Sequence, residues 1–299
     1  MADPGASPRQ EYLLAPDLLR RLEQAAVASR HVLSGRTKGE RRSAQRGASQ
    51  EFADYRAYTP GDDLRYLDWR AYARLQRLFL KLFMEEEDLH VYFLLDLSQS
   101  MDFGRPAKLA WAVQVVAALG YMALCSGARV QVRTCGGTGE SSRLFRGRGS
   151  APEVFSWLSA RQAGGEAELP AAVRWLAASA PAPGLTFLVS DLLTPQWEPA
   201  LSNLAVVQGE AAVLQVLAPE EYAPGYPGDL LLVDSECGET REVTMGRGLL
   251  QLYERERDGF LAEVRGRCLR YDFPYLLSQS DQRVEDVVLR SLRQLQVVK

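Results

Sequence analysis

Short apolar segments alternate with helical ones along most of this 299-residue chain, and this alternation limits the folds open to it. Strands are predicted at residues 91–95, 129–134, 185–189, 211–217 and 275–277. Helices are predicted between or after them, at residues 108–126, 152–159, 169–178, 248–270 and 284–295. Strands that are apolar on both faces need cover on both sides, which indicates a doubly wound, mostly parallel α/β sheet with helices on both faces.

The first part of the chain lacks this alternation. An amphipathic helix is predicted at residues 16–33, because leucines and alanines recur there at helical spacing. Residues 78–84 and 91–95 are predicted to form a β-hairpin around a short acidic turn. We therefore expect two parts: residues 1–77, a helix and an arginine- and aspartate-rich arm packed on the core, and residues 78–299, the α/β domain.

Composition argues against several classes of protein. The net charge of −3 does not favour nucleic-acid binding through a basic surface. Residues 109–128 lack charge and are long enough to cross a bilayer, but their place in the α/β alternation favours a buried core helix. The four cysteines form no Cys-x-x-Cys pair, and the N-terminal residues lack the basic start of a signal peptide. We therefore expect a cytoplasmic protein without a membrane span.

A polar loop predicted at residues 34–50 carries a group of basic side chains, namely Arg36, Lys38, Arg41, Arg42 and Arg46. Such a group can bind the phosphates of a nucleic acid or of another ligand. It is equally typical of a solvated loop in an acidic protein. Phosphate binding would weaken steeply with salt, which separates the two interpretations.

Two of the predicted strands end in an aspartate. Asp96 follows the strand at 91–95, Asp191 follows the strand at 185–189, and Ser98 and Ser100 come at alternate positions after Asp96. Ligands of doubly wound sheets bind at the carboxyl ends of strands where the strand order reverses. If the two strands are neighbours, their oxygens meet at one edge, and hard cations such as Mg²⁺ bind few protein oxygens while keeping waters. The pattern therefore predicts a cation site.

These motifs carry a resemblance to a known family. The sequence DLSQS, from Asp96 to Ser100, fits the D-x-S-x-S pattern of the metal-ion-dependent adhesion site in von Willebrand factor A domains, and LVSD, which ends at Asp191, resembles the strand with the distal aspartate of that site. Together with GASQEFADYRAYTPGDDLRYLDWRAYARLQRLFLKLFMEEED upstream and GDLLLVDSECGETREV downstream, they make nearly the whole chain similar to a bacterial family of domains of unknown function with a von Willebrand factor A-like core.

The resemblance implies a fold and a function. The fold would be von Willebrand factor A-like, and the protein would be a non-enzymatic interaction module. Members of the family are often encoded beside MoxR-type AAA+ ATPases, so the implied partners are such an ATPase and an unidentified client protein. In the adhesion-site mechanism a carboxylate of the partner completes the coordination of Mg²⁺, or of Mn²⁺ or Ca²⁺.

The sequence departs from the adhesion-site pattern at one position. In GGEAELPAAVRWL, Glu166 stands where the pattern has a threonine, and Glu168 is an equally acidic neighbour. If Glu166 is a ligand, the site binds its cation more tightly and attracts a partner's carboxylate less. If it is not, Asp96, Ser98 and Ser100 would hydrogen-bond among themselves and cap the next helix. Both interpretations stay open.

The segment YRAYTPGDDLRYLDW also has two interpretations. Arginines paired with carboxylates would pin the N-terminal arm on the sheet, because bidentate pairs are specific in geometry. Alternatively the segment is a docking surface for a partner, since Arg, Tyr and Trp dominate the energetics of interfaces. The residues concerned are Tyr55, Arg56, Asp62, Asp63, Arg65, Asp68 and Trp69.

The alternative function is a metal-dependent hydrolase that uses the same carboxylates. It would need a general base near an activated water, for which Asp102 and Glu166 are the candidates. The chain has two histidines, His31 and His90, neither in a position that predicts catalysis, and it lacks the spacing of a P-loop. We therefore expect no enzymatic activity and assign no catalytic residue.

Overall fold

The computed structural model describes residues 13–25, 51–60, 62–84, 89–137, 139–180, 182–225, 228–233 and 240–294. The chain divides into two compact units. The core unit comprises Met1–Arg36 and Leu89–Lys299, and the inserted unit comprises Thr37–Asp88. The basic loop from Arg36 to Arg46, and with it the predicted phosphate-binding group, lies outside the described residues, as does His31.

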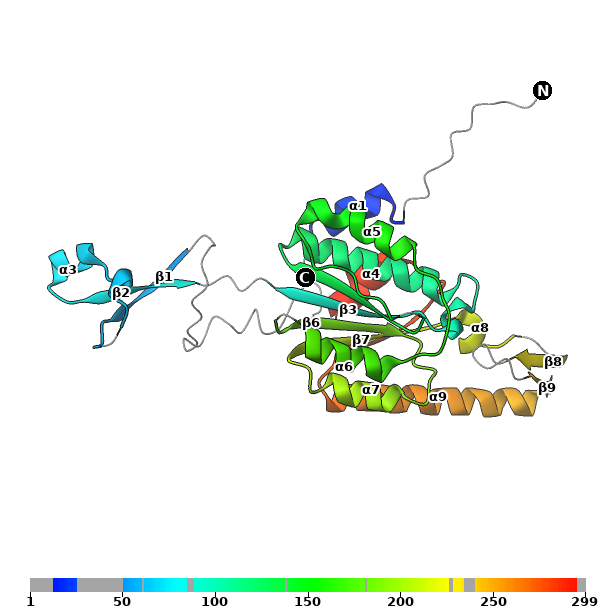
Figure 1. Ribbon diagram of the computed structural model, residues 1–299. Coiled ribbons are helices and arrows are strands. Elements are labelled where there is room, and N and C mark those ends of the chain that lie inside the picture. Colours follow the sequence, from blue (N-terminus) through cyan, green and yellow to red (C-terminus); the bar gives the residue numbers. More distant parts are fainter. Residues whose placement is uncertain are drawn as a thin grey trace, which may run out of the picture. The chain divides into compact units, whose positions relative to one another are not determined.

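A six-stranded sheet forms the centre of the core unit (Figure 1). Its strands are β3 (His90–Asp96), β4 (Arg129–Cys135), β5 (Phe145–Arg146), β6 (Gly184–Ser190), β7 (Gly209–Leu217) and β10 (Tyr275–Gln279). They lie in the order β10-β7-β6-β3-β4-β5, and every pair is parallel except β4 and β5. The order reverses between β3 and β6, because β4 and β5 add on one side of β3 and the later strands on the other. The predicted doubly wound, mostly parallel sheet is confirmed.

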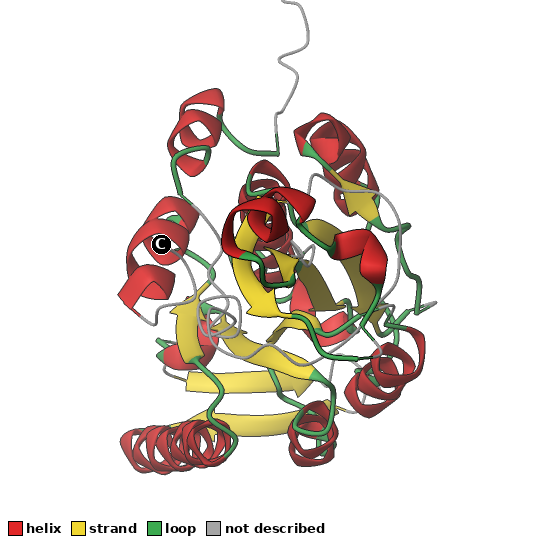
Figure 2. Ribbon diagram, turned by 90° about the vertical axis from the view of Figure 1, so that its left-hand side faces the viewer, coloured by secondary structure: helices red, strands yellow, loops and turns green. Residues whose placement is uncertain are grey.

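Helices cover both faces of this sheet (Figure 2). One face carries α1 (Pro16–Leu22), α4 (Lys108–Cys125), α5 (Ala151–Ser159) and a C-terminal helical segment of α10 (Val284–Asp286), η4 (Val287–Ser291) and α11 (Leu292–Gln294). The other face carries α6 (Leu169–Ser179), α7 (Trp197–Leu204) and α9 (Arg247–Arg270). Side chains of β3 alternate between the two cores, with Phe93 facing α4 and Leu94 facing α6.

Helix α4 is the apolar segment whose length allows a membrane span. Among the described residues it is the one helix long and apolar enough to cross a bilayer, and 83% of it is buried inside the protein. Its side chains pack against the sheet and against α1 and α5. In this structure α4 is therefore a core helix, as its place in the sequence predicts.

The inserted unit differs from the prediction in its strand pairing. Its β1 (Glu51–Ala57) pairs antiparallel with β2 (Phe79–Met84), and η1 (Leu64–Tyr66) and α3 (Trp69–Leu75) lie between them in the chain. The predicted hairpin between residues 78–84 and 91–95 is wrong. Strand β3 is buried along its length and takes β4 and β6 as neighbours, so β2 pairs with the polar β1 instead. The sequence predicts one N-terminal part of residues 1–77, whereas the structure groups Met1–Arg36 with the core unit and gives Thr37–Asp88 as the inserted unit.

The remaining elements follow the sheet strands or connect them. Strands β8 (Gly228–Val233) and β9 (Thr240–Met245) form an antiparallel pair that precedes α9. Short helical turns follow the carboxyl ends of β3 and β7 and precede α5. They are η2 (Gln99–Asp102), η3 (Arg148–Ser150) and α8 (Pro219–Tyr222).

A stacked aromatic pair at the centre of the sheet generates a stability prediction. Phe93 and Phe187 are fully buried on neighbouring strands, with ring centroids 5.2 Å apart. We expect Phe187→Ala to lower the free energy of unfolding by about 3–5 kcal/mol, because it leaves a cavity in a packed core. Val206→Ala is the control, since Val206 is 80% exposed and its truncation should change stability by less than about 0.5 kcal/mol. Urea unfolding of both variants measures the difference, and equal losses would contradict the assignment of the core.

Candidate functional site

The two predicted aspartates lie together at the carboxyl edge of the sheet. Asp96 ends β3 and Asp191 directly follows β6, and these strands are parallel neighbours with Leu95 opposite Val189. Both carboxylates are buried. The reversal of strand order falls between the same two strands, so the cluster occupies the position where doubly wound sheets bind ligands.

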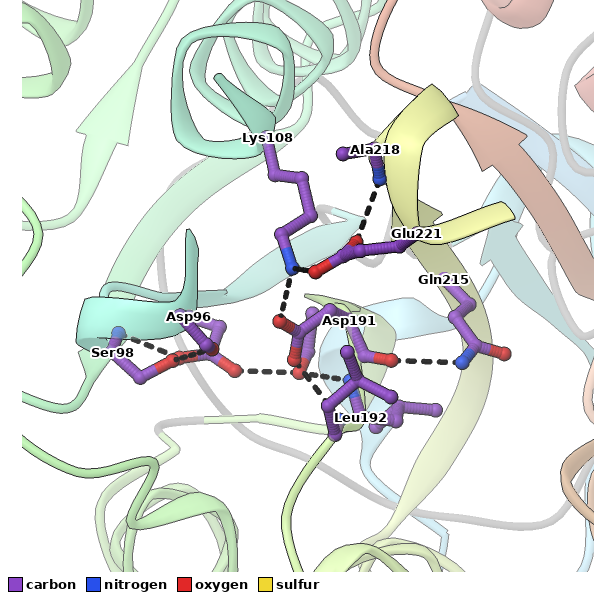
Figure 3. Close-up of polar contacts among 11 residues, drawn as sticks. Asp96, Ser98, Lys108, Asp191, Leu192, Gln215, Ala218 and Glu221 are labelled. Atoms are coloured by element: carbon purple, nitrogen blue, oxygen red, sulfur yellow. Dashed lines mark hydrogen bonds and ion pairs between the residues drawn. The ribbon is translucent and has the colours of Figure 1, made fainter. Parts of the chain in front are cut away.

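Asp96 is held by hydrogen bonds from its own loop and from β6 (Figure 3). Its Oδ1 accepts from the Ser98 backbone N–H at 2.9 Å, and its Oδ2 accepts from the Ser190 hydroxyl at 2.5 Å. The hydroxyls of Ser98 and Ser100 share a hydrogen bond of 3.0 Å. Burial raises the pKa of Asp96 and the nearby charge of Asp191 raises it further, while the bonds from Ser190 and Ser98 oppose the shift.

A lysine that the sequence analysis did not single out completes the cluster. Lys108 begins α4, and its side chain is fully buried. Its Nζ donates to Asp191 Oδ2 at 2.7 Å and to Glu221 Oε1 at 2.5 Å (Figure 3). A positive charge supplied by the protein itself therefore lies at the edge where the sequence predicts a metal ion.

Close packing of two loops brings Lys108 and Glu221 together. Gly104, in the loop before α4, has a φ of +98°, and a Cβ at this position would lie 2.5 Å from the Cβ of Ala218. The Pro106 carbonyl in the same loop accepts from the Ser280 hydroxyl at 2.7 Å. The loop is thus seated against the start of α8, and a larger residue than Gly104 would separate the two elements.

Strand β7 and the turn after β6 fix the position of Asp191. Its Oδ1 accepts from the Leu193 backbone N–H at 3.0 Å, and its carbonyl accepts from the Gln215 amide at 2.8 Å. Gln215 in turn accepts from the Tyr275 hydroxyl at 2.7 Å. The intervening Leu192 has a φ of +58°, a left-handed conformation that is uncommon for a leucine and bends the chain around the carboxylate.

Glu221 comes from the four-residue helix α8. Its Oε2 accepts from the Ala218 backbone N–H at 2.8 Å, which caps the helix. Two side chains of α9 hold the helix from outside, since the Tyr253 hydroxyl donates to the Glu221 carbonyl and Arg257 donates to the Tyr222 carbonyl. Burial raises the pKa of Glu221, although the Lys108 ammonium acts in the opposite direction.

The loop with Glu166 reaches the cluster through its backbone. The Gln99 N–H donates to the Gly165 carbonyl at 2.9 Å, and the Gly164 N–H donates to the Leu97 carbonyl at 2.7 Å. The side chains of Glu166 and Glu168 are exposed. Ligation of a cation by Glu166 stays a prediction.

The carboxylate oxygens of the cluster suit an ammonium ion better than a divalent cation. Both oxygens of Asp96 accept hydrogen bonds from the protein, and Asp191 is paired with Lys108. A divalent ion between the two aspartates would lie beside the ammonium and be repelled by it. Within the described ranges, no group of three or more His, Cys, Asp or Glu side chains is arranged to hold a metal. In this arrangement the residues do not fit the predicted Mg²⁺ ion.

The candidate docking segment of the inserted unit forms a local network. Asp68 caps α3, accepting from the N–H groups of Arg70 and Ala71, and it also accepts from the Tyr55 hydroxyl at 2.8 Å. Further pairs join Arg56 to Asp62 at 2.6 Å and Arg65 to Asp63 at 2.5 Å. Hydrogen bonds from Thr59 are the main cause that lowers the pKa of Asp62 to about 2.

Part of this segment also faces solvent. Trp69 is 64% exposed and stacks edge-to-face with Tyr72. The contacts therefore agree with a structural network within the inserted unit. The two predicted roles of the segment, pinning the arm on the sheet and docking a partner, stay predictions.

The buried ion pairs generate a second stability prediction. We expect Lys108→Met to lower the free energy of unfolding by about 3–5 kcal/mol, because Asp191 and Glu221 lose the ammonium that neutralises them. Arg143→Met is the matched control, since the Arg143–Glu153 pair is more than half exposed and is worth about 0–1 kcal/mol. Guanidinium unfolding of both variants measures the effect. Similar losses in the two would show that Lys108 does not neutralise the cluster.

Sequence and structure comparisons relate the chain to other bacterial proteins. It is 25% identical over 274 residues to the uncharacterized protein Mb1516 of Mycobacterium bovis, a match that covers 89% of this chain and 86% of that protein. The uncharacterized protein Rv1480 of Mycobacterium tuberculosis matches to the same extent. The solved structure of the conserved hypothetical protein BatB from Bacteroides thetaiotaomicron is similar with a TM-score of 0.43 and 12% identity, over 70% of this chain and 98% of that chain.

A family model gives the assignment. The model described as protein of unknown function DUF58 matches residues 54–258, which is more than half of the chain and includes both aspartates of the cluster. The protein therefore belongs to the DUF58 family.

Proposed function

We propose that this protein is a non-enzymatic interaction module, and that a protein partner docks on the carboxyl edge of its von Willebrand factor A-like core. Two exposed apolar side chains carry the proposal. Phe103 is 49% exposed on the loop after β3, and Leu193 is 45% exposed on the loop after β6. They flank the buried polar cluster, and aromatic and other apolar side chains are enriched in the core of protein interfaces.

The partner we propose is a MoxR-type AAA+ ATPase, with the two proteins acting together on a client in the cytoplasm. The family resemblance supports this choice. In this role the DUF58 protein recognises the client, and the ATPase supplies the energy of ATP hydrolysis that remodels it. The DUF58 protein itself then needs a surface that binds and no catalytic group.

Substitution of the two apolar side chains tests the docking edge. We expect Phe103→Ser and Leu193→Ser each to weaken binding of the purified ATPase from the same organism about tenfold or more, which corresponds to about 1.4 kcal/mol of lost apolar contact. Val206→Ser is the matched control, because Val206 is 80% exposed but precedes β7, at the amino edge of the sheet. Calorimetric titration of ATPase with each variant gives the affinities.

Each result of this titration decides one part of the proposal. Circular dichroism first establishes that the three variants are folded. Equal affinities of Phe103→Ser, Leu193→Ser and the wild type would contradict the docking edge. An ATPase that fails to bind the wild type would contradict the proposed partner.

A further inference from the structure

The buried ammonium of Lys108 has two carboxylate partners of unequal accessibility. The side chain of Lys108 is fully buried, that of Asp191 is 2% exposed, and that of Glu221 is 17% exposed. Solvent therefore reaches this ion cluster from the side of Glu221. We propose that Lys108 is the centre of a carboxylate-binding site, that Glu221 is its internal occupant, and that an acidic side chain of a partner takes the place of Glu221. The identity of the partner rests on the function proposed above.

The cation of this site is part of the chain. Lys108 is the first residue of α4, whose side chains pack into the core, and its ammonium has no exposed surface through which to leave the cluster. A buried ammonium is very costly unless carboxylates accept its hydrogen bonds. The ammonium of Lys108 thus occupies the position of a bound cation, and the site takes a carboxylate without a divalent ion.

The two carboxylates differ in exposure and in the element that carries them. Asp191 follows a central strand, and hydrogen bonds from Leu193 and Gln215 fix its oxygen and its carbonyl. Glu221 lies on a four-residue helix, and its carboxylate has one further bond, to the Ala218 N–H. Exchange of either carboxylate breaks one hydrogen bond from a backbone N–H. The two differ in access, because Glu221 is 17% exposed on a short helix, whereas Asp191 is 2% exposed directly after a central strand.

The surroundings indicate what kind of acid would bind. The Phe103 ring centroid lies 6.0 Å from Lys108 Nζ, and this ring is about half exposed. An acidic side chain entering beside Glu221 would place its neighbouring residues near this aromatic face. The chemistry favours a partner segment in which an Asp or Glu stands next to an apolar residue.

Release of Glu221 from Lys108 would change the contacts that hold α8 beside α9. Tyr253 and Arg257 of this helix donate to the backbone of α8, so α8 is tied to α9 as well as to Lys108. When a partner's carboxylate replaces Glu221, α8 keeps the hydrogen bonds from Tyr253 and Arg257 and the contact of Ala218 with the Gly104 loop. The exchange therefore connects the docking edge to the helix that follows the β8–β9 pair.

Chemical rescue with acetate tests the site without any partner. We expect Glu221→Ala to lower the melting temperature by roughly 5–10 °C, because it removes one carboxylate from a buried ammonium. Sodium acetate, compared with sodium chloride at equal ionic strength, should then raise the melting temperature saturably as the ion fills the vacated position. The double variant Lys108→Met/Glu221→Ala and the wild type should show no acetate-specific rise. A rise of the same size in all three proteins would overturn the proposal.

Lysine NMR gives a second readout. The chain has four lysines, Lys38, Lys81, Lys108 and Lys299, so a protein with labelled lysine side chains gives a simple spectrum. Acetate should shift the Lys108 signal of Glu221→Ala, which is identified as the signal that the double variant lacks. If Glu221→Ala does not fold, Glu221→Ser vacates the same space and is titrated instead. An unchanged Lys108 signal at saturating acetate would contradict the site.

Magnesium chloride tests whether a divalent ion, rather than the Lys108 ammonium, is the cation of this site. We expect no saturable rise in the melting temperature of the wild type with Mg²⁺. A saturable rise that Asp96→Asn abolishes would show that a divalent ion, and not Lys108, is the centre of the site.

The outcomes separate this site from the proposed partner. Acetate rescue in a protein that fails to bind the ATPase would support the carboxylate site and contradict the choice of partner. ATPase binding without acetate rescue would overturn the carboxylate site and leave docking on Phe103 and Leu193 in place.

Discussion

The buried ion cluster of Lys108, Asp191 and Glu221 is the interaction on which the carboxyl edge of the sheet depends. It joins the first residue of α4, the end of β6 and the short helix α8, three elements that are far apart in the sequence. Three charged groups can stay buried here only while each keeps its partners, because an unpaired charge in this environment costs several kcal/mol. The positions of α4, the end of β6 and α8 therefore depend on one another.

In the proposed function, the same cluster lies beneath the surface on which the partner docks. Its charges are satisfied inside the protein, and the loops beside it expose two apolar side chains, Phe103 and Leu193. A partner that presents an acid beside an apolar residue would match both features. Glu221 connects the buried cluster to the protein surface, since it is the accessible member of the cluster and its helix is held by α9.

The sequence pattern predicts this edge of the sheet and its two aspartates, but not the lysine that lies between Asp191 and Glu221. The apolar runs ending in Asp96 and Asp191 predicted two strands of a parallel sheet, and the structure shows that these strands are neighbours. The predicted hairpin of residues 78–84 and 91–95 was wrong, because adjacency along the chain favoured a pairing that the fully buried β3 does not make. Strand β1 was missed, because EFADYRA lacks a continuous apolar run.

Local pattern alone determined most strand and helix segments of the core and the two aspartates, because apolar periodicity and strand ends are visible within a few residues. Helix α7 was not predicted. Only the tertiary structure decided what those aspartates face. Lys108 lies 83 residues before Asp191 and 113 before Glu221, and in the sequence it is an ordinary residue at a helix start. Its burial, and the presence of an ammonium where the sequence predicts a metal ion, follow from long-range contacts with Asp191 and Glu221, which no short-range pattern records.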